Sequence, residues 1–256
     1  MMPSITGLVL TYNGERLLDK CLQSLSFCDK ILIVDSFSTD ETLAIAEKHK
    51  ATILQNPWGG FKKQFEFGLQ HIESEWVISL DQDEICSATL KEKILSELQH
   101  VEPSTTAFRP CRRNWYFDRF MKHSGWYPDR LIRIFRPEHL TVTQSGSHES
   151  FSASGTIKDI DADILHYPYE SFAHHLEKIN LYAQEGAEDL KRKKRKGGIA
   201  TALAHATMRF IKIYFLKLGM LDGKAGFINA MHGFFYVFLK YVRIDEGNWG
   251  TPFDAE

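Results

Sequence analysis

The chain has 256 residues, of which 43% are hydrophobic and 25% charged, and a formal net charge of −2 at pH 7. These values are ordinary for a soluble globular protein with a substantial core, and they argue against nucleic acid as a partner. The four cysteines form no CxxC pair, so we expect reduced thiols and neither a disulfide framework nor a zinc site. The Met-Met-Pro-Ser start lacks a basic region, and we expect no signal peptide.

The first eighty residues alternate between short apolar runs and segments with helical spacing. This alternation predicts an α/β fold with a mostly parallel, doubly wound sheet. No G-x-G-x-x-G follows the first strand, and the chain has no P-loop motif, so we expect neither a dinucleotide site nor a P-loop. The predicted strands cover residues 5–11, 31–34, 52–54 and 76–80, and the predicted helices cover residues 15–25, 42–49 and 63–73.

The strand predicted at 76–80 ends in a cluster of carboxylates. Asp81 and Asp83 would share one face if the extended chain continued through Gln82. Two hard oxygen ligands at the carboxyl end of a strand suit Mg²⁺ or Mn²⁺ carrying a phosphate. For an isolated Asp-x-Asp, a solvated acidic turn that caps the next helix is the commoner explanation.

Three motifs together narrow these alternatives. Thr11-Tyr12-Asn13, the segment 34–40 (Val-Asp-Ser-Phe-Ser-Thr-Asp) and Leu80-Asp81-Gln82-Asp83-Glu84 resemble the three nucleotide-site motifs of family 2 glycosyltransferases, in order and spacing. The resemblance covers roughly the first hundred residues and implies the GT-A fold. Later segments at 125–130, 132–136, 148–149 and 166–169 resemble a branch that includes bacterial lipopolysaccharide inner-core β-1,4-glucosyltransferases.

The resemblance implies a role for each matched residue of the nucleotide site. Thr11, Tyr12 and Glu15 would border the uracil of a UDP-sugar. Asp35 would accept a hydrogen bond from the uracil ring or the ribose, and Asp81 would hold the ribose or the metal shell.

The resemblance also implies a metal site. Asp83 would ligate the Mg²⁺ or Mn²⁺ that bridges the diphosphate, and His166 would complete the shell, since a neutral imidazole is a good ligand. A core or surface histidine is the alternative reading of His166.

Two positions depart from the family pattern. Gly14 stands where many relatives have glutamate, and Phe65 stands where many carry a basic residue. Lys62 or Lys63 would then have to supply the charge for the phosphates.

An aromatic-rich stretch at 115–127 follows a strand predicted at 108–112. Aromatic faces beside polar groups suit sugar stacking, although aromatics also line ordinary cores. We therefore predict Trp126, Arg130 and His148 as acceptor-binding residues. The segment 130–135 alternates like a strand with a charged face.

The family resemblance points to His148-Glu149, and on that basis Glu149 is our candidate for the catalytic base. An inverting transfer needs a base beside the acceptor hydroxyl, and Glu149 follows a Gly/Ser-rich turn that could hold it there. A surface loop pair at His148-Glu149 is the alternative. Asp129 and Asp118 are the next candidates.

The last third of the chain is predicted to be helical, at 176–190, 199–221 and 227–242. Six basic residues, 191–196, separate the first two helices. The longest uncharged run, 225–239, has 15 residues and is shorter than a membrane span of about 20. The helices could lie in the plane of an anionic membrane, dock a lipid-linked acceptor, or pack on the sheet domain or a second subunit.

The sequence thus predicts a GT-A catalytic domain at 1–170 and a helical membrane- or acceptor-associating region at 171–256. The predicted protein is cytoplasmic and peripheral on the inner face of the cytoplasmic membrane. It would move glucose from UDP-glucose to a heptose of a lipopolysaccharide core, with inversion. A metal-dependent nucleotidyltransferase and a non-catalytic membrane scaffold are the alternatives. The missing Gly-rich basic loop disfavours the first, and the set of carboxylates disfavours the second.

Overall fold

The computed structural model describes residues 2–145 and 148–248, without the side chains of residues 144, 145, 148, 149, 247 and 248. The chain divides into two compact units. The first contains residues 1–113 and 128–167, and the second contains residues 114–127 and 168–256. The predicted boundary after residue 170 lies close to the break at 167, but the segment 114–127 goes with the second unit.

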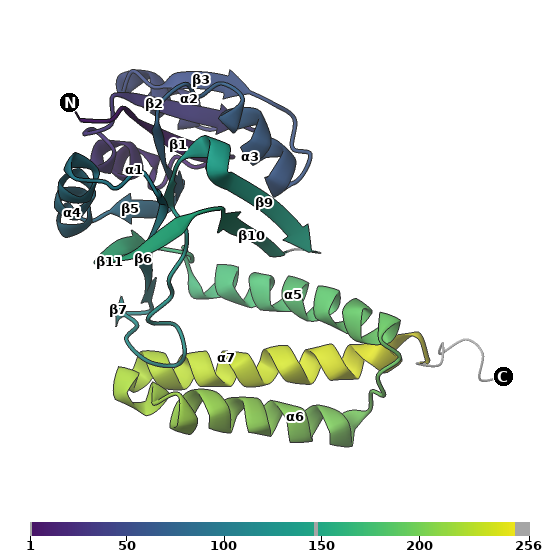
Figure 1. Cartoon of the computed structure of the whole chain (residues 1–256). Helices are drawn as coiled ribbons and strands as arrows, with labels where there is room; N and C mark the ends of the chain where they lie inside the picture. Colours follow the sequence, from purple (N-terminus) through teal and green to yellow (C-terminus); the bar gives the residue numbers. More distant parts are fainter. Residues whose placement is uncertain (1, 146–147, 249–256) are drawn as a thin grey trace. The chain divides into compact units, whose positions relative to one another are not determined.

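Four parallel strands open the first unit, in the order β3-β2-β1-β4 (Figure 1). This arrangement confirms the predicted α/β fold class. The strands are β1 (Ile5–Thr11), β2 (Lys30–Asp35), β3 (Thr52–Gln55) and β4 (Trp76–Asp81), and the helices between them are α1 (Leu18–Ser24), α2 (Thr42–Lys48) and α3 (Phe61–Leu69).

The sheet continues beyond β4 in the order β8-β6-β11-β5. The pairs β4–β8, β6–β8 and β5–β11 are antiparallel, so antiparallel pairs extend the parallel strands of the sheet. The elements are β5 (Glu84–Cys86), α4 (Ala88–Gln99), β6 (Thr105–Tyr116), β8 (Ile134–Phe135), η1 (Pro137–His139) and β11 (Thr156–His166), with a separate hairpin of β9 (Leu140–Ser145) and β10 (His148–Ala153).

Two apolar clusters form the core of this unit. In one of them Phe65 is fully buried, and its ring stacks on Phe61 and contacts Phe151 and Phe135. A charged side chain at position 65 would lose its hydration in this place. The departure from the family pattern at this position is therefore part of an aromatic core.

The second unit is mainly helical. It contains the end of β6, β7 (Arg119–Phe120), α5 (Phe172–Arg192), α6 (Ile199–Ile211), the π-helical turn η2 (Lys212–Leu216), η3 (Gly219–Asp222), α7 (Gly223–Val242) and η4 (Arg243–Asn248). The helix predicted through residue 221 is interrupted at Leu218, whose φ of 55° is left-handed. No helix in the described part of the chain is both long and apolar enough to cross a membrane.

Close packing joins η3 to α7. A Cβ atom at Gly226 would lie 1.8 Å from the carbonyl oxygen of Gly219, so only glycine fits there. Asp222 is buried beside this contact and accepts hydrogen bonds from the amides of Lys122 and His123 and from the hydroxyl of Ser124. The loop before Trp126 is thereby tied to the helical turn.

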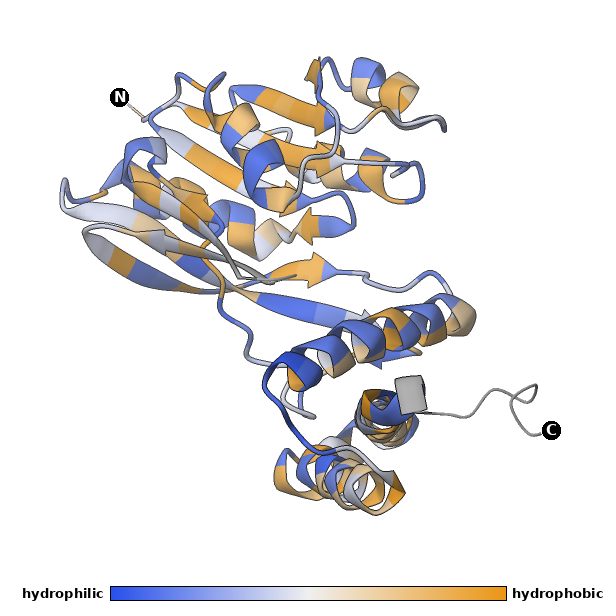
Figure 2. Cartoon of the chain, turned by 90° about the vertical axis from the view of Figure 1, so that its right-hand side faces the viewer, coloured by the Kyte–Doolittle hydropathy of each residue, from blue (hydrophilic) through white to orange (hydrophobic). Residues whose placement is uncertain are grey.

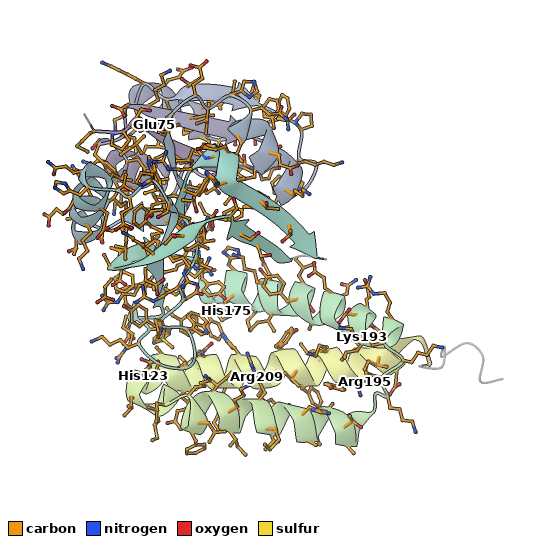
Figure 3. The ribbon with its side chains drawn as sticks, viewed as in Figure 1. Glu75, His123, His175, Lys193, Arg195 and Arg209 are labelled. Carbon is orange, nitrogen blue, oxygen red and sulfur yellow. The ribbon has the colours of Figure 1, made fainter. Side chains whose placement is uncertain are left out.

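A buried polar cluster lies at the centre of this unit, where His175 projects from α5 (Figure 3). The Tyr116 hydroxyl lies 2.8 Å from His232 Nδ1 and 3.1 Å from His175 Nδ1, and the two histidine Nδ1 atoms are 2.9 Å apart. Tyr169 stacks on His175 with ring centroids 3.9 Å apart. Burial, and then the neighbouring His232, lower the pKa of His175 to about 3, so the cluster is neutral near pH 7.

We expect this cluster to make the fold acid-sensitive. Below a pH of about 6.5 the unfolded chain binds a proton at His175, which the folded chain accepts only near pH 3. Stability should therefore fall as the pH drops through this window, by up to about 1.4 kcal/mol per pH unit for one group. Urea unfolding followed by tryptophan fluorescence at several pH values measures the slope.

The substitution His175→Gln should flatten this slope, because it removes the titrating group but keeps a polar side chain. His174→Gln, one position earlier on α5, is the matched control and should leave the slope unchanged. Equal slopes for the wild type and His175→Gln would contradict the assignment.

Candidate active site

The carboxyl ends of three neighbouring strands bring the predicted nucleotide residues to one edge of the sheet. In the parallel register Thr11 of β1 pairs with Asp35 of β2, and Leu10 pairs with Asp81 of β4. Ligands of open α/β sheets bind at this edge. Thr11, Asp35 and Asp81 therefore lie where the sequence predicted them.

Asp35 is fully buried, and both of its carboxylate oxygens accept hydrogen bonds. The donors are the Thr11 hydroxyl at 3.1 Å, the Ser38 amide at 2.9 Å, the Ser38 hydroxyl and the Gln55 amide group at 3.3 Å. In this arrangement Asp35 fixes the loop that follows β2. Its direct contact with uracil or ribose stays a prediction.

Reciprocal hydrogen bonds join the loop after β1 to the loop after β2. The Thr39 amide donates to the Asn13 side chain at 2.9 Å, and the Glu41 amide donates to the Glu15 carboxylate at 3.1 Å. In return, the Glu15 amide donates to Asp40 at 3.1 Å. Glu15 thus holds the two loops together, and its predicted place beside uracil remains to be tested.

The side chain of Gln82 closes the same edge from the β4 side. Its amide oxygen accepts from the Tyr12 amide at 2.9 Å, and its amide nitrogen donates to the Tyr12 carbonyl at 3.1 Å. A Cβ atom at Gly14 would lie 2.5 Å from the Gln82 oxygen. A side chain at position 14 would therefore have to displace Gln82 and its hydrogen bonds to Tyr12. The Tyr12 ring is left exposed.

The extended chain does not continue through Gln82, and that expectation was wrong. β4 ends at Asp81, residues 82 and 83 form a turn, and Glu84 begins β5. The turn is held because the Glu84 carboxylate accepts a hydrogen bond from the Asp81 amide at 3.0 Å. Strand alternation therefore does not relate Asp81 to Asp83.

A buried arginine holds the carboxylates of this turn. Arg133 Nη2 lies 2.7 Å from Asp81 and 3.0 Å from Glu84, and Arg112 lies 3.7 Å from Glu84. Burial opposes ionisation of Asp81, but the charge and the hydrogen bond of Arg133 lower its pKa. Burial, together with the charge of Asp81, raises the pKa of Glu84.

Sequence reasoning missed the roles of Arg133 and Glu84. Arg133 was expected on the charged face of a strand at 130–135, but the strand covers only Ile134–Phe135 and the arginine is buried. A signal was available, because a single arginine inside the apolar run Leu131-Ile132-Arg133-Ile134-Phe135 indicates a buried, paired charge.

The two predicted metal ligands lie side by side. Asp83 Oδ2 is 3.6 Å from His166 Nε2, and the Tyr167 amide donates to the Asp83 carbonyl at 3.0 Å. The pairing of β5 with β11 places His166 opposite Glu84. Among the side chains that the structure describes, no group of three or more His, Cys, Asp or Glu residues is arranged to hold a metal. One carboxylate and one imidazole fit a divalent cation that shares its remaining positions with phosphate and water.

Two of the predicted acceptor residues belong to different units of the chain. Arg130 belongs to the first unit and pairs with Asp161 at 3.4 Å and Asp159 at 3.7 Å. Trp126 belongs to the second unit and packs against Tyr116 and Tyr169. The roles of both in acceptor binding stay predictions.

The predicted catalytic pair lies on β10. The backbone of Glu149 pairs with Gln144 of β9, and that of His148 pairs with Ser145. The side chains of His148 and Glu149 lie outside the described residues, so the structure leaves the role of Glu149 open.

The alternative bases and the two lysines suggested for the phosphates lie in ion pairs or are exposed. Of the proposed bases, Asp129 pairs with Arg112 at 3.0 Å and Asp118 pairs with Arg119 at 2.8 Å. Lys62 lies 3.6 Å from Glu66 on α3, and Lys63 is exposed.

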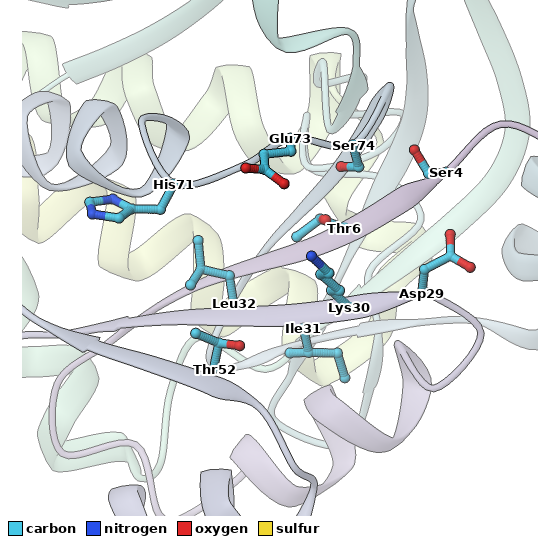
Figure 4. A pocket seen from close by; sticks show the side chains of 10 residues that line it. All are labelled: Ser4, Thr6, Asp29, Lys30, Ile31, Leu32, Thr52, His71, Glu73 and Ser74. Carbon is cyan, nitrogen blue, oxygen red and sulfur yellow. The ribbon is translucent and has the colours of Figure 1, made fainter.

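A cavity of about 340 Å³ lies at the opposite ends of the parallel strands (Figure 4). Its lining includes Thr6, Lys30 and Thr52, near the starts of β1, β2 and β3. It therefore does not belong to the carboxyl edge where the candidate site lies.

Comparison with known proteins decides the family. Residues 8–168 match the model of Glycosyl transferase family 2, which is more than half of the chain. This chain is a family 2 glycosyltransferase. It is 26% identical over 253 residues to the lipopolysaccharide core biosynthesis glycosyltransferase LpsC of Rhizobium meliloti, covering 95% of this chain and 93% of LpsC.

Two further similarities extend over nearly the whole chain. A glycosyltransferase of Rickettsia felis is 25% identical over 256 residues, with 96% of this chain and 90% of the relative covered. The crystal structure of residues 1–349 of Staphylococcus aureus TarS covers 95% of this chain and 82% of that chain, with 18% identity and a TM-score of 0.48.

The contact between Gln82 and Gly14 predicts a coupled pair of substitutions. Gly14 does not have a positive φ, so Gly14→Ala should cost stability only through the clash with Gln82. We expect a loss of about 1–3 kcal/mol in the wild type and a much smaller loss in a Gln82→Ala background. Urea unfolding of the four proteins measures the coupling.

Gly59→Ala serves as a control for the general effect of replacing a loop glycine, because the nearest atom to its Cβ is the flexible side chain of Lys63. Additive costs for Gly14→Ala and Gln82→Ala would show that the two positions are independent.

Proposed function

We propose that this family 2 glycosyltransferase moves glucose from UDP-glucose to a heptose of a lipopolysaccharide core, with inversion at the anomeric carbon. The observation that carries the proposal is the pair Asp83–His166, 3.6 Å apart, on the turn that follows β4 and at the end of β11. The similarity to LpsC supports the acceptor class.

Asp83 and His166 would hold Mg²⁺ or Mn²⁺. When bound, the cation neutralises the charge that develops on the departing diphosphate. Arg133 keeps Asp81 ionised beside this turn, and the joined loops after β1 and β2 offer the exposed Tyr12 ring and nearby polar groups for uracil and ribose.

The acceptor side requires a base. In the proposed step the acceptor hydroxyl oxygen bonds to the anomeric carbon while the bond from that carbon to the phosphate oxygen breaks. The hydroxyl proton passes to the Glu149 carboxylate, and UDP leaves with the electron pair of the broken bond. Attack from the face opposite the phosphate inverts the configuration.

One assay separates this function from its alternatives. With UDP-glucose, Mn²⁺ and a heptose-containing core acceptor, the proposed reaction releases UDP only when the acceptor is present. A nucleotidyltransferase would release pyrophosphate from UTP and a sugar phosphate, and a scaffold would release neither. A screen of other UDP-sugars in the same assay tests the donor.

The predicted place of action, the inner face of the cytoplasmic membrane, belongs to this proposal. Assembly with a second copy of the chain also belongs to this proposal, and the helical unit would have to form the contact.

Asp83→Asn should weaken metal-dependent binding of UDP by about tenfold or more, because the amide keeps the shape of the side chain but loses the ligand charge. Titration calorimetry of UDP with Mn²⁺ and with EDTA measures the effect. Asp161→Asn, an exposed aspartate on β11, is the matched control and should bind as the wild type does. Unchanged affinity of Asp83→Asn, with or without EDTA, would remove Asp83 from the metal site.

Glu149→Gln should lower kcat by ~10²–10⁴-fold, because glutamine reaches the same atoms but accepts no proton. The affinity for UDP should stay near that of the wild type, since the base faces the acceptor. Steady-state rates of UDP release measure kcat, and calorimetry measures the affinity for UDP. Glu138→Gln, an exposed glutamate in η1, controls for the substitution itself. Turnover within a fewfold of the wild type would place the base elsewhere.

A further inference from the structure

Helix α6 has the reverse of the usual surface pattern. Its buried residues are small, Ala202 and Ala206, while Ile199 and Met208 are 68% and 60% exposed. A helix on the surface of a globular domain normally buries its large apolar side chains. These exposed large apolar side chains of α6 have no partner within the described chain that covers them.

The apolar surface continues past the end of α6. Leu216 of η2 is 71% exposed, and its neighbour Phe215 is also exposed. Phe227 of α7 adjoins this surface. Its ring centroid is 6.0 Å from that of Phe210 and 5.8 Å from that of Tyr214. We call this surface the apolar face; its exposed members are Ile199, Leu203, Met208, Phe215, Leu216, Leu218, Met220, Leu221 and Phe227. Figure 2, which views α6 and α7 nearly end-on, shows hydrophobic residues (orange) on both helices.

Basic residues predominate beside the apolar face, and Asp189 of α5 pairs with two of them, Arg192 and Lys193. Residues 191–221 contain nine lysines and arginines and no aspartate or glutamate. Six of them form the exposed run 191–196, and the others are Arg209, Lys212 and Lys217 (Figure 3). Lys193 to Lys196 also line a cavity of about 600 Å³ that reaches Thr201 and His205 of α6.

This combination fits a lipid surface better than a protein partner. Lysine is depleted in the core of protein interfaces, yet Lys212 and Lys217 stand inside the apolar run. At a bilayer, long lysine side chains extend to the headgroups while their neighbours enter the acyl region. Two copies of the face would bring like charges together, which disfavours a dimer through this surface.

We propose that the apolar face of α6, η2 and η3 docks on the surface of an anionic phospholipid bilayer, lying in its plane. The exposed apolar side chains enter the boundary of the acyl region, and the run 191–196 with Arg209, Lys212 and Lys217 contacts the anionic headgroups. This surface belongs to the second unit, and its assignment does not rest on the proposed reaction.

Sedimentation of the whole protein with vesicles tests the docking. The wild type should bind vesicles of phosphatidylcholine with phosphatidylglycerol, and bind less at high salt or when phosphatidylglycerol is omitted. Phe215→Ser with Leu216→Ser should weaken binding by about tenfold or more, since two exposed apolar side chains are lost. Leu176→Ser with Leu181→Ser, which removes two exposed apolar residues from α5, is the matched control and should bind as the wild type does.

Replacing the six residues 191–196 with serine should weaken binding more at low salt than at high salt. Equal binding by the wild type and the Phe215/Leu216 variant would overturn the proposal. So would a dimer of the wild type in solution that the same variant converts to a monomer without any change in vesicle binding.

A fluorescent label tests insertion directly. Cys21, Cys86 and Cys111 are buried and Cys28 is half-buried, so in a Cys28→Ser background a thiol-reactive, polarity-sensitive dye should prefer the new thiol of Leu216→Cys. We expect its emission to shift to the blue on anionic vesicles, while a dye on Leu181→Cys of α5 should not shift. An unchanged spectrum at position 216, with the protein bound to vesicles, would show that another surface makes the contact.

Discussion

The paired burial of Arg133 with Asp81 and Glu84 is the constraint on which the candidate site depends. A guanidinium taken out of water must be matched by carboxylates, and these carboxylates are joined to the backbone as well. Glu84 accepts from Arg133 and from the Asp81 amide, so it reverses the chain within two residues. That reversal presents Asp83 to His166. Loss of one partner would leave a buried charge without a counter-charge. The same loss would also release the turn.

The loops at the same edge are held by side-chain hydrogen bonds to backbone amides. Asp35 fixes the loop after β2, Asn13 and Glu15 connect it to the loop after β1, and Gln82 connects that loop to the turn after β4. Each connection is modest, but together they fix backbone that has no strand pairing of its own. Several residues expected to contact nucleotide thus also hold the loops at this edge of the sheet.

The second unit combines close packing inside with an apolar exterior. Its interior uses glycine, alanine and the neutral cluster of Tyr116, His175 and His232. Because small residues occupy the contact between α6 and α7, the large apolar side chains of α6 are left on the outside. The feature that makes the helices pack closely therefore also creates the surface that we assign to the bilayer.

The sequence by itself determined the approximate strands and helices of the first eighty residues, the family resemblance, and the place of Asp35 and Asp81 at the ends of strands. These follow from local apolar periodicity and short motifs, which depend on neighbours along the chain. Only the tertiary structure showed that Arg133 is buried, that Gly14 lies against the side chain of Gln82, and that α6 exposes large apolar side chains. Each of these depends on which distant residues meet: Arg133 lies about fifty positions from Asp81, and Gln82 about seventy from Gly14. A pattern along the chain records the spacing of residues but not the partner that each one meets, and for a charge, a glycine or an exposed leucine the partner decides the role.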